Sequence, residues 1–248
     1  MAKDARGWRC KFAVVAPSTN TIVQPDMDDF RVPGVTNHFG RIFVPNMKVS
    51  NDEDFVALVD AIGATLYDAV DRCVTAEPDY LIMGMSALMF WDGRAPSEKR
   101  MQELSDHCGL RVSAGSFACE AALNLHKAKR IAVISPYFPV SDKNVTLFFQ
   151  DCGFDVVRFR GLKCPSPVAI AQVQEDELRR HVAEMDGDDV DAFVQVGTNL
   201  SMCSLCVELE KEYGKPFIAI NAATYWHSLR AMGINDQFPG HGPLFEHH

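Results

Sequence analysis

Short apolar runs alternate along this chain with longer stretches whose apolar residues recur every three or four positions. In the first part of the chain, the short β-prone runs are 12–16, 38–44, 80–83 and 110–113. The stretches with helical spacing are 54–74, 97–108 and 117–126, and Ser97 is the expected cap of the second. Such runs are typical of buried strands and such spacing of amphipathic helices. The pattern therefore predicts alternating strands and helices.

The second part of the chain repeats this order. Strands are expected at 130–134, 155–159, 192–196 and 216–220, and helices at 141–151 (capped by Ser141), 175–185, 207–213 and 222–232. Alternation of this kind predicts parallel sheets covered by helices on both faces. The expected fold is α/β, with two pseudo-symmetric, flavodoxin-like halves and an active-site cleft between them. The first half is expected to comprise 1–116 with a returning segment 221–248, and the second 117–220.

Two loops at strand ends match each other, Val15–Thr21 in the first half and Val133–Tyr137 in the second. The third strand of each half also runs into a polar loop, at 84–87 and at 197–199. Ligands of parallel α/β sheets bind beyond the carboxyl ends of the strands, so the four loops are expected to line one cleft. Their hydroxyls, amides and backbone N–H groups suit a small anionic substrate.

Composition narrows the possible partners and the location. The apolar fraction of 47% and the charged fraction of 23% are typical of a globular protein, and the formal charge of -9 without a basic stripe argues against nucleic acid. No apolar run reaches the roughly 18 residues that a membrane span needs. The segment 1–4 begins no apolar signal core, so a cytoplasmic protein is expected. The terminal His247 and His248 resemble the start of a purification tag and are given no role.

Eight cysteines are scattered along the chain, and two of them, Cys203 and Cys206, form a CxxC motif. No second CxxC or histidine pair accompanies it, whereas a zinc site needs about four ligands. In a chain of this size without an export signal, the cysteines are expected to be reduced and mostly packed in the core. Neither a metal nor another cofactor is predicted.

Several short motifs occur in a characteristic order. They are Pro17-Ser18-Thr19-Asn20-Thr21, Pro96–Arg100, Lys127–Val133, Pro136-Tyr137 and Pro239–Gly242. By the order and spacing of these motifs, nearly the whole chain resembles the aspartate/glutamate racemase superfamily. The most similar branch holds maleate cis–trans isomerase and arylmalonate decarboxylase. The resemblance implies a cofactor-independent isomerase or lyase that converts a small carboxylic acid. We also expect a homo-oligomer, because apolar helices of such folds commonly pair subunits.

The resemblance also implies a cradle for a substrate carboxylate, built from one amide and one phenol with hydroxyls and backbone N–H groups of the third-strand loops. The implied residues are Asn20, Tyr137, Ser86, Thr198 and Asn199. Ser18, Met85 and Gly197 are further candidates for contact with the substrate. Simpler roles remain open for some of them. Asn20 can cap the next helix, and Tyr137 can be an aromatic at the edge of the core. Ser86 and Thr198 can be ordinary turn hydroxyls.

The chain departs from the family at two positions. Racemases and maleate isomerase carry one cysteine in each third-strand loop, and the decarboxylase keeps only the second; Met85 and Gly197 stand at these positions here. Two-base racemisation and thiolate addition to a double bond both need those thiolates. The prediction is therefore non-cysteine chemistry on a dicarboxylic or heterocyclic acid: decarboxylation, isomerisation, or hydrolysis by a water in the space left at Gly197. His241 is the candidate base.

Two other hypotheses stay open. A relocated thiol could act, either Cys119 or Cys203, whose place near a helix N-terminus would lower its pKa. The protein could instead bind a carboxylate without converting it. Phe90 and Trp91 are expected to pack in the core or to wall an apolar pocket, and Arg41 to pair with a carboxylate or to lie on the surface.

Overall fold

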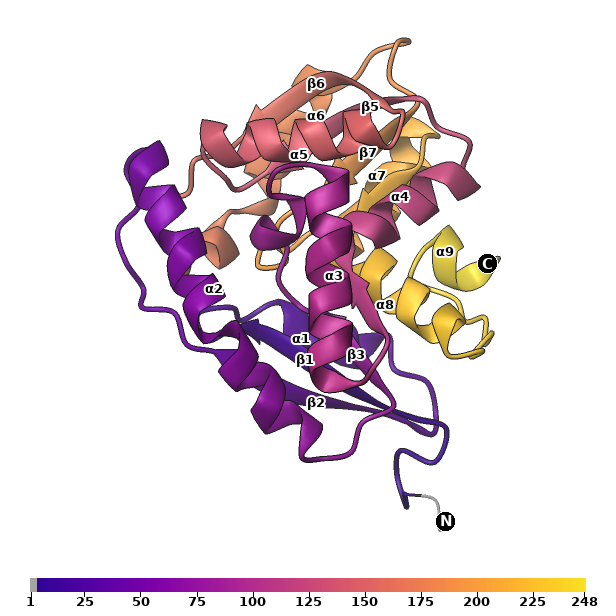
Figure 1. The fold of residues 1–248 in the computed structure, drawn as a ribbon. Coiled ribbons are helices and arrows are strands. Elements are labelled where there is room, and N and C mark those ends of the chain that lie inside the picture. Colours follow the sequence, from indigo (N-terminus) through magenta and orange to yellow (C-terminus); the bar gives the residue numbers. More distant parts are fainter. Residues whose placement is uncertain (1–3) are drawn as a thin grey trace.

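The protein is built around two four-stranded parallel sheets (Figure 1), and the computed structural model describes residues 4–248. The strand order in the first sheet is β2 (Val35–Ile42), β1 (Cys10–Pro17), β3 (Tyr80–Met83), β4 (Val112–Ala114). The strand order in the second is β6 (Asp155–Gly161), β5 (Arg130–Ser135), β7 (Ala192–Gln195), β8 (Phe217–Ala219). Each sheet follows the order second, first, third, fourth. The predicted α/β fold with two similar halves is confirmed.

Helices connect the strands in both halves. In the first half they are α1 (Val23–Asp29), α2 (Asp52–Val74), the 3-10 turn η1 (Ala87–Phe90), and α3 (Arg94–Cys108). Further along the chain are α4 (Gly115–Leu125), α5 (Pro139–Asp151), the 3-10 turn η2 (Ala169–Gln172), α6 (Glu175–Met185), α7 (Cys203–Tyr213), α8 (Ile220–Ala231) and α9 (Pro243–Glu246). Within residues 4–248, none of these helices has the length and apolarity to cross a membrane.

The central strands are buried on both faces. Every residue of β3 and of β7 is buried, because helices cover both sides of a parallel sheet. β1 pairs in parallel with both β2 and β3, which aligns Val15, two residues before the end of β1, with Met83 at the end of β3. The loops that follow these strands therefore begin side by side at one edge of the sheet.

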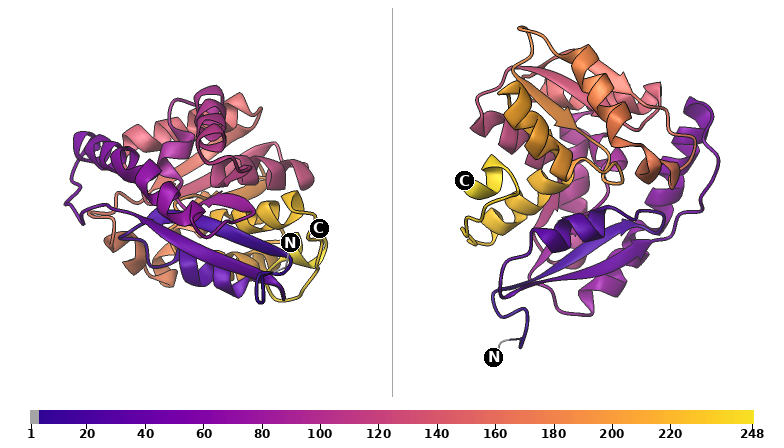
Figure 2. Two further views of the ribbon diagram at one scale, coloured as in Figure 1. Left: turned by 60° about the horizontal axis from the view of Figure 1, so that its bottom comes forward. Right: turned by 180° about the vertical axis from the view of Figure 1, so that it is seen from behind.

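Two helices carry the chain between the halves. α4 starts directly after β4 of the first sheet and leads to β5 of the second, and α8 starts directly after β8 and packs against α4 (Figures 1 and 2). From α8, the Tyr225 ring packs edge-on against Phe12 of β1 at 5.6 Å, and the Tyr225 hydroxyl donates to Asn37 Oδ1 at 3.0 Å. Arg9 and Asp236 form an ion pair. The C-terminal segment thus lies against the first half.

The division at 116/117 and 220/221 remains a prediction, and residues 1–3 of the predicted first half lie outside the described residues. Several element ends differ from the sequence pattern. β2 starts three residues before the predicted strand and ends two residues earlier, at Ile42. The predicted caps Ser97 and Ser141 are wrong, because α3 begins at Arg94 and α5 at Pro139. Both serines are buried inside these helices, where Ser97 Oγ donates to the Gly93 carbonyl at 2.8 Å.

Candidate active site

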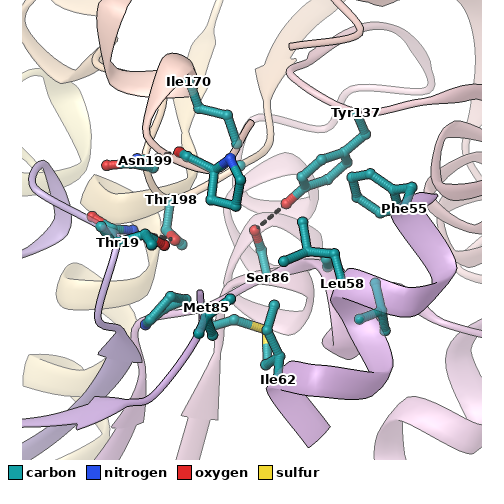
Figure 3. A pocket seen from close by; sticks show the side chains of 17 residues that line it. Thr19, Phe55, Leu58, Ile62, Met85, Ser86, Tyr137, Ile170, Thr198 and Asn199 are labelled. Atoms are coloured by element: carbon teal, nitrogen blue, oxygen red, sulfur yellow. Dashed lines mark hydrogen bonds between the residues drawn. The ribbon is translucent and has the colours of Figure 1, made fainter. Parts of the chain in front are cut away.

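The strand-end loops of both halves meet at a central pocket (Figure 3). It is lined by Pro17, Thr19, Asn20, Val44, Phe55, Leu58, Val59, Ile62, Met85, Ser86, Ala87, Tyr137, Pro167, Ile170, Gly197, Thr198 and Asn199. Its volume is about 60 Å³. Since one water needs about 10–15 Å³ on the same measure, the pocket suits a small molecule. None of these lining residues is charged, so an anion would be held by neutral donors.

A tyrosine and a serine from opposite halves face each other across the pocket. Ser86 follows β3, Tyr137 follows β5, and their hydroxyl oxygens lie 2.6 Å apart (Figure 3). Burial raises the pKa of Tyr137 well above its ordinary value, so the phenol stays protonated at neutral pH. One of the two hydroxyl protons is used between the residues. The other is free to donate to a ligand.

Asn20 and Thr198 form a second link between the halves. Asn20 Oδ1 accepts from the backbone N–H groups of Ile22 and Val23 at 3.0 and 2.9 Å, just ahead of α1. The N-cap residue of α1 is Ile22, so Asn20 is not the helix cap that the simpler role expected. Asn20 Nδ2 donates to Thr198 Oγ1 at 3.0 Å, and that hydroxyl donates to the Gly84 carbonyl at 3.1 Å. The Thr198 proton is thus committed, while the second Asn20 amide proton remains for a ligand.

Asn199 fixes the loops around the pocket. Its Oδ1 accepts from the Thr21 N–H at 2.9 Å and its Nδ2 donates to the Pro167 carbonyl at 2.9 Å. Within residues 4–248, the backbone N–H groups of Ser86, Thr198 and Asn199 have no acceptor. Together with the free hydroxyl and amide protons, these N–H groups are donors of the kind that can bind a carboxylate or an enolate oxygen.

Helix α2 supplies an apolar wall opposite the polar loops. Phe55, Leu58, Val59 and Ile62 face the pocket from its first three turns (Figure 3). Asp52 Oδ1, at the start of α2, accepts from the Val140 N–H of α5 at 3.0 Å and ties this wall to the second half. The sequence pattern located this helix but not its role. The same apolar spacing serves a core face or a pocket wall, so no signal in the sequence separates them.

Gly197 lies where a side chain would not fit. Its φ is +97°, and a Cβ would lie 2.5 Å from two carbons of the Pro136 ring. The same Cβ would lie 3.7 Å from the Tyr137 hydroxyl. The Pro136 ring thus occupies the direction in which a Gly197 side chain would extend, while Gly197 itself lines the pocket. Met85, the other departure from the family pattern, lines the pocket.

Three predicted residues lie away from the pocket. Ser18 Oγ both donates to and accepts from the Val44 backbone, at 3.2 and 3.0 Å. His241 packs edge-on against Phe30 at 5.3 Å, at the C-terminal end of the chain. Arg41 donates to the Asn20 carbonyl at 3.0 Å and to a glutamine of α1. The structure therefore does not bring these side chains to the lining.

Phe90 packs against helix α5 rather than against the pocket. Its ring lies 5.2 Å from that of Phe148 and 5.6 Å from that of Phe149, and it is fully buried. The expectation of core packing is confirmed for this residue. Trp91, the next residue, is half-buried and packs against the core; its carbonyl accepts from Arg100.

No cysteine of residues 4–248 lines the pocket. Burial raises the pKa of Cys119. Cys203 lies at the start of α7, as expected, but burial and the neighbouring Asp26 raise its pKa well above the ordinary value. The expected lowering by the helix N-terminus is therefore wrong, because desolvation and a nearby carboxylate oppose it. Neither thiol is poised as a thiolate at this site.

Comparison with known proteins identifies the family. A model of the arylmalonate decarboxylase family matches residues 47–245. The chain belongs to this family. It is also 29% identical over 246 residues to a maleate isomerase of Pseudomonas putida, an alignment that covers 93% of this chain and 94% of that protein. The relatives are thus isomerases and decarboxylases.

Solved structures show the same fold. A maleate cis–trans isomerase of Nocardia farcinica, a cysteine-to-serine mutant with a covalently bound succinylcysteine intermediate, matches with a TM-score of 0.87 at 20% identity, over 96% of this chain and 99% of that one. A liganded double mutant of arylmalonate decarboxylase matches with a TM-score of 0.79 at 19% identity, over 96% and 99%. The fold of two facing halves is therefore common to both kinds of enzyme.

Proposed function

We propose that this protein is a decarboxylase of a small malonate-type diacid and that it works without a thiolate. The observation that carries the proposal is the make-up of the pocket. An apolar wall from α2 faces neutral O–H and N–H donors of the strand-end loops, and no cysteine of the described residues 4–248 lines the pocket. This combination suits a reaction that needs desolvation of one carboxylate and stabilisation of an enolate.

The two sides of the pocket would act on different carboxylates. One carboxylate of the substrate accepts hydrogen bonds from the free proton of the Ser86–Tyr137 pair, from Asn20 Nδ2 and from the N–H groups of Thr198 and Asn199. The other lies against Leu58 and its neighbours, where loss of water destabilises its charge. Its C–C bond breaks and carbon dioxide leaves. The electron pair passes into an enediolate that the donors stabilise.

The enediolate must then take a proton at carbon. Tyr137 is the proposed donor, because its phenol lies in the pocket and is held protonated. A phenolate is far less basic than an enediolate carbon, so the transfer is downhill even with a raised phenol pKa. The phenolate then regains a proton from solvent, with Ser86 as its hydrogen-bond partner at 2.6 Å.

The experiment is proton NMR in D2O with phenylmalonate, methylmalonate and maleate as separate substrates. The expected result is loss of a malonate and appearance of the monoacid with deuterium at its α-carbon. Conversion of maleate alone would mean that isomerisation, not decarboxylation, is the activity. Line broadening of every acid without turnover would contradict an enzyme. It would favour a carboxylate-binding protein, which the fully neutral lining also suits.

A further inference from the structure

The CxxC motif lies at the start of a helix that follows a strand. Cys203 is the first residue of α7 and Cys206 lies three residues further, after strand β7 and the pocket loop. Residues three apart in an α-helix have Cα atoms about 5 Å apart. Disulfides span roughly 4.4–6.8 Å between Cα atoms. The two sulfurs can therefore be joined without unwinding the helix, and a CxxC after a strand is typical of redox-active pairs.

A buried carboxylate, that of Asp26, lies beside the first cysteine of this pair. Cys203 Sγ donates to Asp26 Oδ2 at 3.2 Å, and Asn221 Nδ2 donates to the same oxygen at 2.8 Å. Cys206, the second thiol, lies three residues after Cys203 on the same helix. Burial raises the pKa of Asp26 itself, so this carboxylate holds a proton more readily than an exposed one.

The two thiols differ in access. Cys203 is half-buried and lines a cavity of about 80 Å³ together with Asp26, Ser204 and His241. Cys206 is buried and, together with Cys203, lines a second, smaller cavity of about 20 Å³. This is the arrangement that disulfide exchange needs, with one sulfur reachable from outside and a second one close enough to resolve the mixed disulfide.

We propose that Cys203 and Cys206 form a reversible disulfide by exchange with a low-molecular-weight disulfide, with Asp26 accepting the Cys203 thiol proton. The Cys203 sulfur attacks one sulfur of the small disulfide while Asp26 takes the Cys203 proton. The first small thiolate then leaves and takes that proton from Asp26. The Cys206 sulfur then attacks the Cys203 sulfur, and the Cys206 proton passes to the second small thiolate as that thiolate leaves. Two protein thiols are oxidised and one small disulfide is reduced to two thiols.

The test uses the full protein equilibrated in glutathione buffers of increasing oxidised-to-reduced ratio. Samples are quenched with acid, alkylated in denaturant and analysed by peptide mass spectrometry. The expected result is joint loss of the Cys203 and Cys206 thiols, a peptide lighter by two hydrogens, and full recovery with dithiothreitol. Cys206→Ser should instead accumulate glutathione on Cys203. Cys152→Ser, which removes a half-buried cysteine elsewhere, should behave as wild type.

Asp26→Asn tests the proton acceptor, with a thermal melt to check the fold. The rate of disulfide formation should fall by on the order of a hundredfold, as for loss of a general base. An unchanged or higher rate would show that Asp26 only raises the thiol pKa and takes no proton. The pair itself is disproved if both cysteines stay alkylatable at the most oxidising ratio while Cys152 of the same sample becomes glutathionylated.

Discussion

Neutral hydrogen bonds join the two halves at the pocket. Ser86 of the first half meets Tyr137 of the second at 2.6 Å, and Asn20 meets Thr198 at 3.0 Å. All four side chains are buried, and unpaired buried polar groups are costly. These contacts therefore keep the donors in place before a substrate arrives, which is the condition for stabilising an enolate without reorganisation.

Tyr137→Phe tests the proposed proton donor. We expect turnover of a malonate to fall by about 10²–10³-fold, the usual effect of losing one such donor. Tyr80→Phe is the matched control, because the Tyr80 hydroxyl is also buried and lies 2.8 Å from Ser113 Oγ, away from the pocket. The measurement is steady-state turnover of both variants. If Tyr80→Phe loses as much turnover as Tyr137→Phe, the Tyr137 hydroxyl has no specific role in the reaction.

Gly197→Ala tests the close approach of Pro136. The new Cβ would meet the Pro136 ring at 2.5 Å in a backbone with φ +97°. Gly109→Ala is the control, since its φ is +70° and no atom lies within 4 Å of its Cβ. Both should lose about 1 kcal/mol or more of unfolding free energy from backbone strain. Chemical denaturation should show a larger loss for Gly197→Ala; an equal loss would mean that Pro136 yields freely.

Among the secondary-structure elements, α2 contributes both to the core of the first half and to the pocket lining. Its apolar residues bury one face against the first sheet, and the first of them also wall the pocket. Asn51 caps the helix by accepting from the Asp54 N–H at 2.8 Å. The same buried face of α2 thus continues from the core into the apolar wall of the pocket.

Leu58→Ala separates pocket from core along this helix. Leu58 lines the pocket, whereas Leu66, two turns later and equally buried, does not. Both alanine variants should lose about 2–5 kcal/mol of unfolding free energy. Steady-state kinetics should show that Leu58→Ala alone changes the preference between methylmalonate and phenylmalonate, towards the larger acid. The same shift in Leu66→Ala would show that α2 acts only through overall stability.

The elements that the sequence predicts best are those whose burial follows from local pattern. The strand over 80–83 and the helix over 175–185 have the predicted bounds, because the first is a short continuous apolar run and the second repeats apolar residues at helical spacing. Ser97 and Ser141 mislead as caps, since a serine can equally be buried inside a helix. Ser18 and His241 lie in motifs of the sequence that indicate a site, but long-range contacts determine where their side chains lie. Ser18 bonds to the Val44 backbone, and His241 packs against Phe30.

At the scale of the whole molecule, the C-terminal segment packs against both halves. α8 lies beside α4 between the sheets, and α9 brings Phe245 against Phe30 at 4.8 Å (Figure 2). Glu210 of α7 lies in this region. Burial and the nearby Glu246 raise its pKa to about 7. The ionised form of Glu210 is therefore disfavoured in the folded state.

Replacing Glu210 with glutamine should change how the free energy of unfolding depends on pH. With a pKa of about 7 folded and 4.5 unfolded, Glu210 binds its proton more tightly in the folded state. Its destabilising contribution to the free energy of unfolding is absent below about pH 4.5 and grows as the pH rises to about 7. Urea denaturation should show Glu210→Gln gaining stability over wild type between pH 5 and pH 7.5. Glu103→Gln, an exposed control, should not; a pH-independent difference in Glu210→Gln would contradict the assignment.

The most direct test of the central claim is turnover of phenylmalonate by protein that has first been treated with iodoacetamide. Proton NMR in D2O then follows formation of the deuterated monoacid. Because no cysteine of residues 4–248 lines the pocket, the account predicts the same rate before and after treatment. Loss of turnover in proportion to the alkylation of one cysteine would contradict it, because the reaction would then depend on a thiol.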